Sequence, residues 1–96
     1  MNQKYEITDI VHPQYPWLHR IRALRDVRED VHAGDLGGFV QSEENLSQEG
    51  QCWVANNAVA AEESYISGDA IMWDYSCARG CAVISGKSRI GGEAII

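Results

Sequence analysis

The sequence lacks the features that mark secreted, membrane-spanning or nucleic-acid-binding proteins. Its three cysteines are an odd number, and no apolar run approaches the about 18 residues of a membrane helix. Eight basic residues stand against 14 acidic ones, whereas a protein that binds the phosphate backbone needs basic residues in excess. No signal peptide can be recognised. We therefore expect a reduced, cytoplasmic protein that binds neither membranes nor nucleic acid directly.

The 96 residues are 45% hydrophobic, which favours one small ordered domain. From Cys52 to Ile96 the chain repeats every six residues. The first place of each six holds alanine, serine or cysteine, and the third holds mainly aliphatic residues. The fifth place is glycine except at Asn56, Glu62 and Asp74.

This period predicts short strands that turn the same way each time. Alternation puts the first and third places on one inward side, where small and aliphatic residues fill a narrow interior. Glycine, asparagine and aspartate at the fifth place tolerate the positive φ of a turn, and only Glu62 departs from this rule. The pattern is typical of a hexapeptide β-helix, and the alternative is a meander of short antiparallel strands.

The repeats resemble those of the hexapeptide-repeat, left-handed parallel β-helix family, as in Val54 to Ala58, Ile66 to Ala70 and Ile84 to Ser88. The resemblance implies left-handed coils of three sixes each, so that residues eighteen apart stack. We therefore predict an all-β fold: a short left-handed parallel β-helix of about 2.5 coils over residues 52–96. A β-rich cap and a degenerate first repeat occupy residues 1–51, and the two parts form one structural domain.

The segment before the repeats is less clear from its residues alone. Tyr5 and Ile7 alternate with polar residues and predict a strand, whereas residues 17–31 fit either a helix or a strand followed by a turn. The runs RIRALRD (20–26) and GDLGGF (34–39) resemble those of enterobacterial and phage proteins in which this segment is β and caps the first coil. Some of those proteins carry a transferase label, which rests on fold analogy.

The glycines Gly37 and Gly38 do not form a phosphate loop, because the lysine of a P-loop and the spacing of a dinucleotide site are both missing. We expect them to let the backbone fold tightly under the first coil, with Phe39 or Leu36 closing its open end.

Candidates for chemistry are few. The histidines, His12, His19 and His32, all precede the repeats, whereas acyltransferases of the resembled family place a catalytic histidine in or beside the β-helix. His32 could approach a coil face as a general base, but we expect a histidine of the cap or surface. Cys77 and Cys81 have no second pair nearby and predict no metal site. We expect no catalytic residue, no cofactor and no enzymatic activity.

The second place of each six points outward, yet seven of its eight residues are apolar or aromatic. Such exposed patches usually mark contact surfaces, although the N-terminal segment could cover one face. The apolar last coil at Ile90 and Ile96 predicts a homodimer through the C-terminal coil. The predicted partner or self-interface comprises Trp53, Tyr65, Ile71, Trp73, Val83, Ile90, Ile95 and Ile96.

These observations favour a non-catalytic, self-associating protein-binding module. The resemblance implies a phage or prophage protein, which would act by occupying a site on a host protein complex, as counter-defence inhibitors do. Acidic residues at the corners would either mimic nucleic acid there or only aid solubility: Glu62, Glu63, Asp69, Asp74 and Glu93. The alternative is a hexapeptide-repeat acyltransferase-like enzyme, or a relic of one, with sites between subunits.

Overall fold

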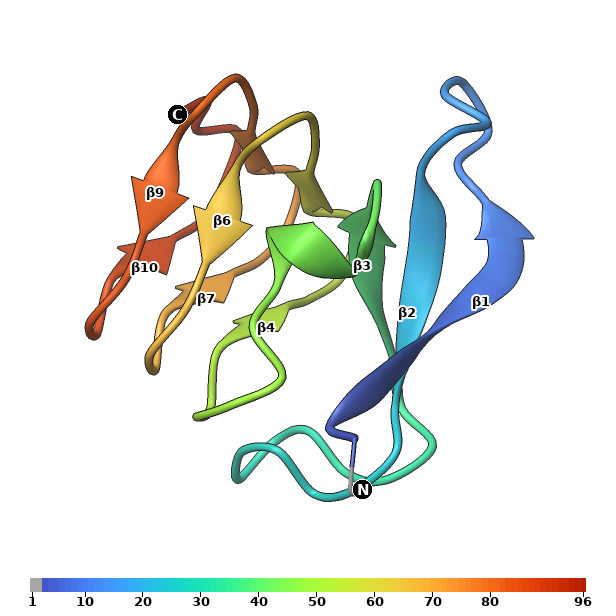
Figure 1. The fold of residues 1–96 in the computed structure, drawn as a ribbon, viewed down its shortest axis with the longest axis vertical. Helices are drawn as coiled ribbons and strands as arrows, with labels where there is room; N and C mark the ends of the chain where they lie inside the picture. Colours follow the sequence, from blue (N-terminus) through green and yellow to red (C-terminus); the bar gives the residue numbers. More distant parts are fainter. Residues whose placement is uncertain (1–2) are drawn as a thin grey trace.

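The computed structural model describes residues 3–96, and no α-helix occurs among them (Figure 1). Three longer strands come first: β1 (Tyr5–Val11), β2 (His19–Ala23) and β3 (Leu36–Val40). A short 3-10 turn, η1 (Glu43–Asn45), follows. The repeats then supply seven two-residue strands: β4 (Trp53–Val54), β5 (Val59–Ala60), β6 (Tyr65–Ile66), β7 (Ile71–Met72), β8 (Cys77–Ala78), β9 (Val83–Ile84) and β10 (Arg89–Ile90).

The short strands stack in parallel at the spacing that the family resemblance implies. Val54 pairs with Met72, which pairs with Ile90, and Ile66 pairs with Ile84. Each of these partners lies eighteen positions further along the chain. The antiparallel meander is therefore wrong for the repeats, and the arrangement fits a β-helix.

The turns follow the fifth place of each six. All seven residues at that place have positive φ, between 56° and 66°. Glu62 obeys this rule with a φ of 59°, although its side chain disfavours the left-handed region. The coil geometry therefore determines the backbone at this position against the preference of the residue.

The N-terminal strands extend one face of the repeats. β1 pairs antiparallel with β2 and β2 with β3, while β3 pairs in parallel with β5, so the five-stranded sheet runs β1-β2-β3-β5-β8. The strand interpretation of residues 17–31 is thus confirmed over His19–Ala23. A β-rich segment ahead of the repeats is also as predicted.

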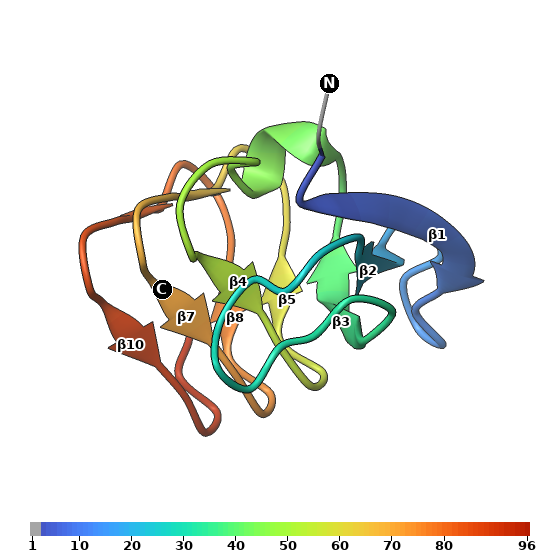
Figure 2. The ribbon, with the colours of Figure 1, turned by 90° about the horizontal axis from the view of Figure 1, so that it is seen from below.

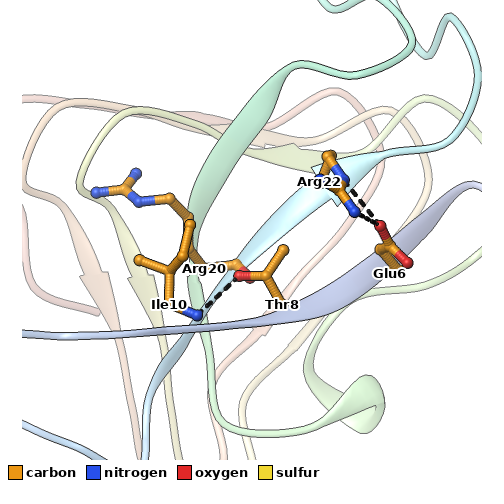
Figure 3. Close-up of polar contacts among 5 residues, drawn as sticks. All are labelled: Glu6, Thr8, Ile10, Arg20 and Arg22. Carbon is orange, nitrogen blue, oxygen red and sulfur yellow. Dashed lines mark hydrogen bonds and ion pairs between the residues drawn. The ribbon is translucent and has the colours of Figure 1, made fainter.

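Polar contacts between β1 and β2 line the exposed edge of this sheet (Figure 3). Arg22 forms an ion pair with Glu6, its Nε lying 2.8 Å from Glu6 Oε2. Thr8 Oγ1 donates to the Arg20 carbonyl at 2.6 Å and accepts from Ile10 N at 3.2 Å. Both partners of the ion pair are well exposed, so it contributes about 0–1 kcal/mol.

One core joins the N-terminal strands to the repeats. It contains Tyr5 and Ile21 from the first two strands and the inward first and third places of the sixes as far as Ile84. Small residues such as Ala58 and Ala70 are fully buried because the interior of the coil is narrow. This core fixes the N-terminal segment against the repeats.

Gly37 and Gly38 lie where two backbones approach closely. A Cβ on Gly38 would sit 2.4 Å from the Ala58 carbonyl oxygen, and one on Gly37 would sit 2.6 Å from the Val54 carbonyl oxygen. The tight approach is therefore as expected. Phe39 is buried beneath the Arg20 guanidinium, whereas Leu36 is 51% exposed, so of the two residues expected to close the coil only Phe39 is buried.

Candidate functional site

The segment between β2 and β3, residues 24–35, forms a strap that runs past the β4-β7-β10 face (Figure 2). Its ends are held by backbone hydrogen bonds, since Leu24 N donates to the Lys4 carbonyl and Gly34 N to the Ala23 carbonyl. Within it, Val27 N donates to the Val31 carbonyl at 2.9 Å, and both valines are buried. The apolar pair anchors the strap, while its charged residues other than the half-buried Arg28 remain exposed.

Arg28 ties the strap to a corner of the repeats. Its Nη1 donates to the Gln51 carbonyl at 2.8 Å and to the Asp69 carbonyl at 3.0 Å. These two carbonyl groups belong to successive coils, eighteen positions apart. The Arg28 side chain therefore fixes the position of the strap relative to the β4-β7-β10 face.

A groove of about 510 Å³ lies between the strap and this face. Its apolar lining residues include Ile71, Trp53 and Trp73, but most of its exposed lining is polar. A neighbouring hollow of about 400 Å³ shares Asp30, Ile71 and Arg89 with it, so these three residues mark the boundary between the two. The groove is lined by Asp30, Val31, Asp35, Leu36, Trp53, Ala55, Asn56, Ile71, Trp73 and Arg89. Its volume is within the range of small-molecule sites, roughly 300–1,000 Å³.

Arg89 and Asp30 carry opposite charges and line this groove, but they do not form an ion pair with each other. Arg89 forms no ion pair with any residue in the described part of the chain, and Asp30 likewise has no ion-pair partner there. The Arg89 guanidinium lies 5.6 Å from the centroid of the Trp73 ring instead. The groove thus offers a cation, carboxylates and an aromatic ring to a ligand.

The Trp73 ring is positioned by a glycine one coil away. A Cβ on Gly91 would lie 2.1 Å from the indole, so only glycine lets the ring lie over this position. Trp73 is half-buried, which leaves part of its ring free for a second contact. A preset aromatic ring loses little entropy on binding.

His32 and Asp26 lie together on the strap. His32 Nδ1 is 3.8 Å from Asp26 Oδ1, and Asp26 Oδ1 accepts from Ala33 N. The His32 amide donates to Asp35 Oδ2 at 2.9 Å, which fixes the turn that carries the imidazole. His32 is exposed and follows Val31, a residue that lines the groove. It lies beside the groove without lining it, and Asp26 lies beyond hydrogen-bond distance of its Nδ1.

The structure separates the residues predicted to form an outward contact surface. Trp53 and Ile71 do point away from the coil interior, but they are only 1% and 7% exposed because the cap and strap lie over them. The expectation that they are exposed is therefore wrong. Together with Trp73 they line the groove. On the other faces Tyr65, Val83, Ile95 and Ile96 are exposed. Ile90 lies in β10, on the same face as Trp53 and Ile71, and is partly buried.

The five acidic residues at the corners are all exposed: Glu62, Glu63, Asp69, Asp74 and Glu93. None of them lines the groove. Their mimicry of nucleic acid stays a prediction, as do the roles predicted for the contact residues.

Sequence reasoning missed four polar residues of the groove: Asp30, Asp35, Asn56 and Arg89. Arg89 did carry a signal, since it is the one charged residue at the second place of the sixes. The two strap carboxylates, Asp30 and Asp35, carried no signal in the sequence, because their position depends on how residues 24–35 cross the β4-β7-β10 face.

The cysteines are all free thiols and differ in environment: Cys52 is buried, Cys77 half-buried and Cys81 exposed. Burial raises the pKa of Cys77, and a hydrogen bond to the Glu63 carboxylate raises the pKa of Cys81. Neither thiol is thereby activated as a nucleophile.

Among residues 3–96, no group of three histidine, cysteine or acidic side chains could hold a metal ion. The same residues include no helix of the length and apolarity needed to cross a membrane.

Comparison with known proteins finds one informative relationship. The chain is 36% identical over 80 residues to the uncharacterized acetyltransferase YdcK of Escherichia coli (strain K12). The match covers 82% of this chain but 19% of the relative, so the chain spans about a fifth of the length of that protein. No protein-family model matches the chain, and no solved structure matches it.

This relationship corrects one prediction. The expectation that the chain has no enzymatic activity is contradicted, because the relative carries the name of an acetyltransferase. The similarity also fits the acyltransferase-like alternative better than the non-catalytic binding module. Phage origin and a host complex as partner stay predictions.

Proposed function

We propose that this chain is an acyltransferase-like protein built on a left-handed β-helix of about 2.5 coils, with the groove under the strap as a substrate site. The observation that carries the proposal is the similarity to a protein named as an acetyltransferase over 82% of the chain. The groove adds support, because it combines an aromatic ring, a cation without an ion-pair partner and carboxylates in a mostly polar lining.

The two sides of the groove suit the two reactants of acyl transfer. Arg89 and Trp73 suit an acyl-CoA donor, because a guanidinium pairs with phosphate and an indole stacks on a nucleotide base. Asp30 and Asp35, on the strap, accept hydrogen bonds and would hold the amine or hydroxyl of the acceptor.

His32 is the general base of this proposal. In acyl transfer the acceptor attacks the thioester carbonyl, the carbon–sulfur bond breaks, and a base takes the proton of the acceptor. The Asp26 carboxylate, 3.8 Å from Nδ1, lies beyond hydrogen-bond distance, so either nitrogen of the neutral imidazole is free to accept the proton. Because His32 lies at the rim, the acceptor would react at the edge of the groove and not at its floor.

Self-association belongs to the same proposal, since the acyltransferase-like alternative has sites between subunits. On the β6-β9 face, Tyr65 and Val83 are paired neighbours and are 40% and 68% exposed. A contiguous exposed apolar pair of this kind is typical of a contact surface. A second copy of the chain on this face, or at the predicted C-terminal coil, would bury exposed apolar surface.

The first test is the thermal stability of the chain with acetyl-CoA. A donor at tenfold its Kd stabilises by about 1.4 kcal/mol, which raises the Tm of a domain of this size by about 8 °C. Arg89→Ala should lose this rise, while Arg79→Ala, which removes a cation outside the groove, should keep it. No rise with millimolar acetyl-CoA in the wild-type chain would overturn the proposal.

Catalysis and assembly need their own measurements. Conversion of acetyl-CoA to CoA, followed by chromatography, should fall at least tenfold in His32→Ala, with donor binding retained.

Light scattering should show an oligomer in the wild-type chain. Val83→Asp and the pair Ile90→Asp with Ile96→Asp distinguish the two predicted contact surfaces, because only the variant at the true interface should give monomers.

A further inference from the structure

The buried amine of Lys4 lies against the buried thiol of Cys52. Both residues are 0% exposed, and Lys4 Nζ is 3.0 Å from Cys52 Sγ. Lys4 immediately precedes β1, and Cys52 is the first residue of the regular repeats, 48 positions later. The proposed acyl transfer uses neither group.

The Lys4 amine is surrounded by neutral oxygens. Nζ donates to the carbonyl groups of Cys52 at 2.9 Å, Glu49 at 3.3 Å and Gly50 at 3.5 Å. No carboxylate pairs with it among residues 3–96. Burial, the largest effect, lowers the pKa of Lys4 and so raises the fraction of neutral amine, which is the nucleophilic form.

The Cys52 sulfur has few other neighbours that could react with it. Its remaining polar contacts are the carbonyl oxygens of Ser47, Glu49 and Ile66, at 3.5 to 3.7 Å. Neither of the other two thiols is among them. A sulfenic acid at Cys52 would therefore meet an amine before it met a second thiol.

We propose that Lys4 Nζ and Cys52 Sγ form a covalent sulfur–nitrogen crosslink when a peroxide oxidises the thiol. In the first step the sulfur attacks hydrogen peroxide, the O–O bond breaks, and the thiol and peroxide become a sulfenic acid and water. In the second step the lone pair of the neutral amine attacks the sulfur, the S–O bond breaks, and hydroxide leaves with an amine proton as water. The sulfur loses two electrons overall, the peroxide gains them, and the protein loses two hydrogen atoms.

The position of the pair favours this outcome over further oxidation. Contact at 3.0 Å makes the second step intramolecular, with the reacting atoms already at near-attack distance. Hydrogen peroxide is little larger than water and reaches buried groups through local opening, whereas bulky oxidants are excluded. The crosslink would join the N-terminal strands to the first repeat, and thiol reductants would reverse it.

The test uses the full chain with Cys77→Ser and Cys81→Ser, which leaves Cys52 as its one thiol. After exposure of the folded protein to hydrogen peroxide, mass spectrometry should show a loss of about 2 Da and a crosslinked peptide pair containing Lys4 and Cys52. Dithiothreitol should restore the original mass. The closed loop, which spans 48 positions, should raise the Tm by roughly 20 °C.

Lys4→Arg is the matched control, since it keeps the positive charge and removes the nucleophilic amine. Lys4→Met serves the same purpose if arginine does not fit the buried site. In either folded variant the loss of two hydrogens should disappear, and Cys52 should instead gain oxygen. The proposal is overturned if Cys52 gains oxygen in the parent protein without a crosslink. It is equally overturned if Cys52 stays unmodified under conditions that oxidise Cys81 in the wild-type chain.

Discussion

Trp53 and Tyr65 occupy equivalent outward places in the repeats, yet truncating them to alanine should have very different effects on stability. Trp53 is 1% exposed, under the cap and strap, while Tyr65 is 40% exposed on the β6-β9 face. In Trp53 the indole packs edge-on against the Tyr5 ring, with centroids 6.4 Å apart, and against Gly37.

The expected loss of stability in Trp53→Ala follows from the area that the tryptophan side chain buries. A tryptophan buries about 150–250 Å², worth roughly 4–6 kcal/mol at about 25 cal/mol per Å², and large-to-alanine changes in cores cost about 3–5 kcal/mol. We expect Trp53→Ala to lower the free energy of unfolding by about 4 kcal/mol. Tyr65→Ala should lower it by about 1 kcal/mol or less.

Urea unfolding measures the difference, followed by far-ultraviolet circular dichroism because removing a tryptophan alters the fluorescence. With a slope of about 2 kcal/mol per molar urea, the midpoint of Trp53→Ala should fall by about 2 M and that of Tyr65→Ala by about 0.5 M or less. Both should be measured at one protein concentration, so that self-association affects them alike. Equal shifts would refute the reasoning, because they would mean that the cap and strap do not cover Trp53 in solution.

Three further predictions concern the backbone and pH. Gly38→Ala should lower the free energy of unfolding in urea by about 3 kcal/mol, because the new Cβ meets the Ala58 carbonyl. Gly92→Ala, with open space around it, should lower it by only about 1 kcal/mol through backbone strain. Similar losses in the two variants would mean that β3 does not pack this closely. Glu62→Gly should raise the free energy of unfolding by about 0.5–1 kcal/mol by relieving the positive φ, and a decrease would show that the contacts of the Glu62 side chain outweigh that strain. Burial raises the pKa of Tyr5 above its usual 10.0, so the stability that it contributes is complete below pH 10 and is lost as the pH rises further. Tyr5→Phe should therefore lose stability relative to wild type below pH 10 and less above it, and a pH-independent difference between pH 8 and 11 would contradict this.

The repeats could be read from the sequence because their structure is local. The same small, aliphatic and glycine places recur in each six, and the family resemblance implies three sixes per coil, so the two together predict the pairing of Val54 with Met72, eighteen positions apart. The positive φ of the corners follows from the recurring fifth place, and even Glu62 conforms, as does Gly80, which stacks on it in the next coil.

The candidate site could not be read in this way because it depends on contacts between distant segments. Nothing in residues 24–35 indicates that they cross the β4-β7-β10 face, since that path depends on the burial of Val27 and Val31 and on Arg28 reaching two corners. Hydrophobic periodicity shows which way Trp53 points but not what covers it, so an outward tryptophan appeared exposed. By itself the sequence determined the coils and their inward and outward faces. Only the tertiary structure decided which outward face is covered, because a side chain is buried by whatever packs on it.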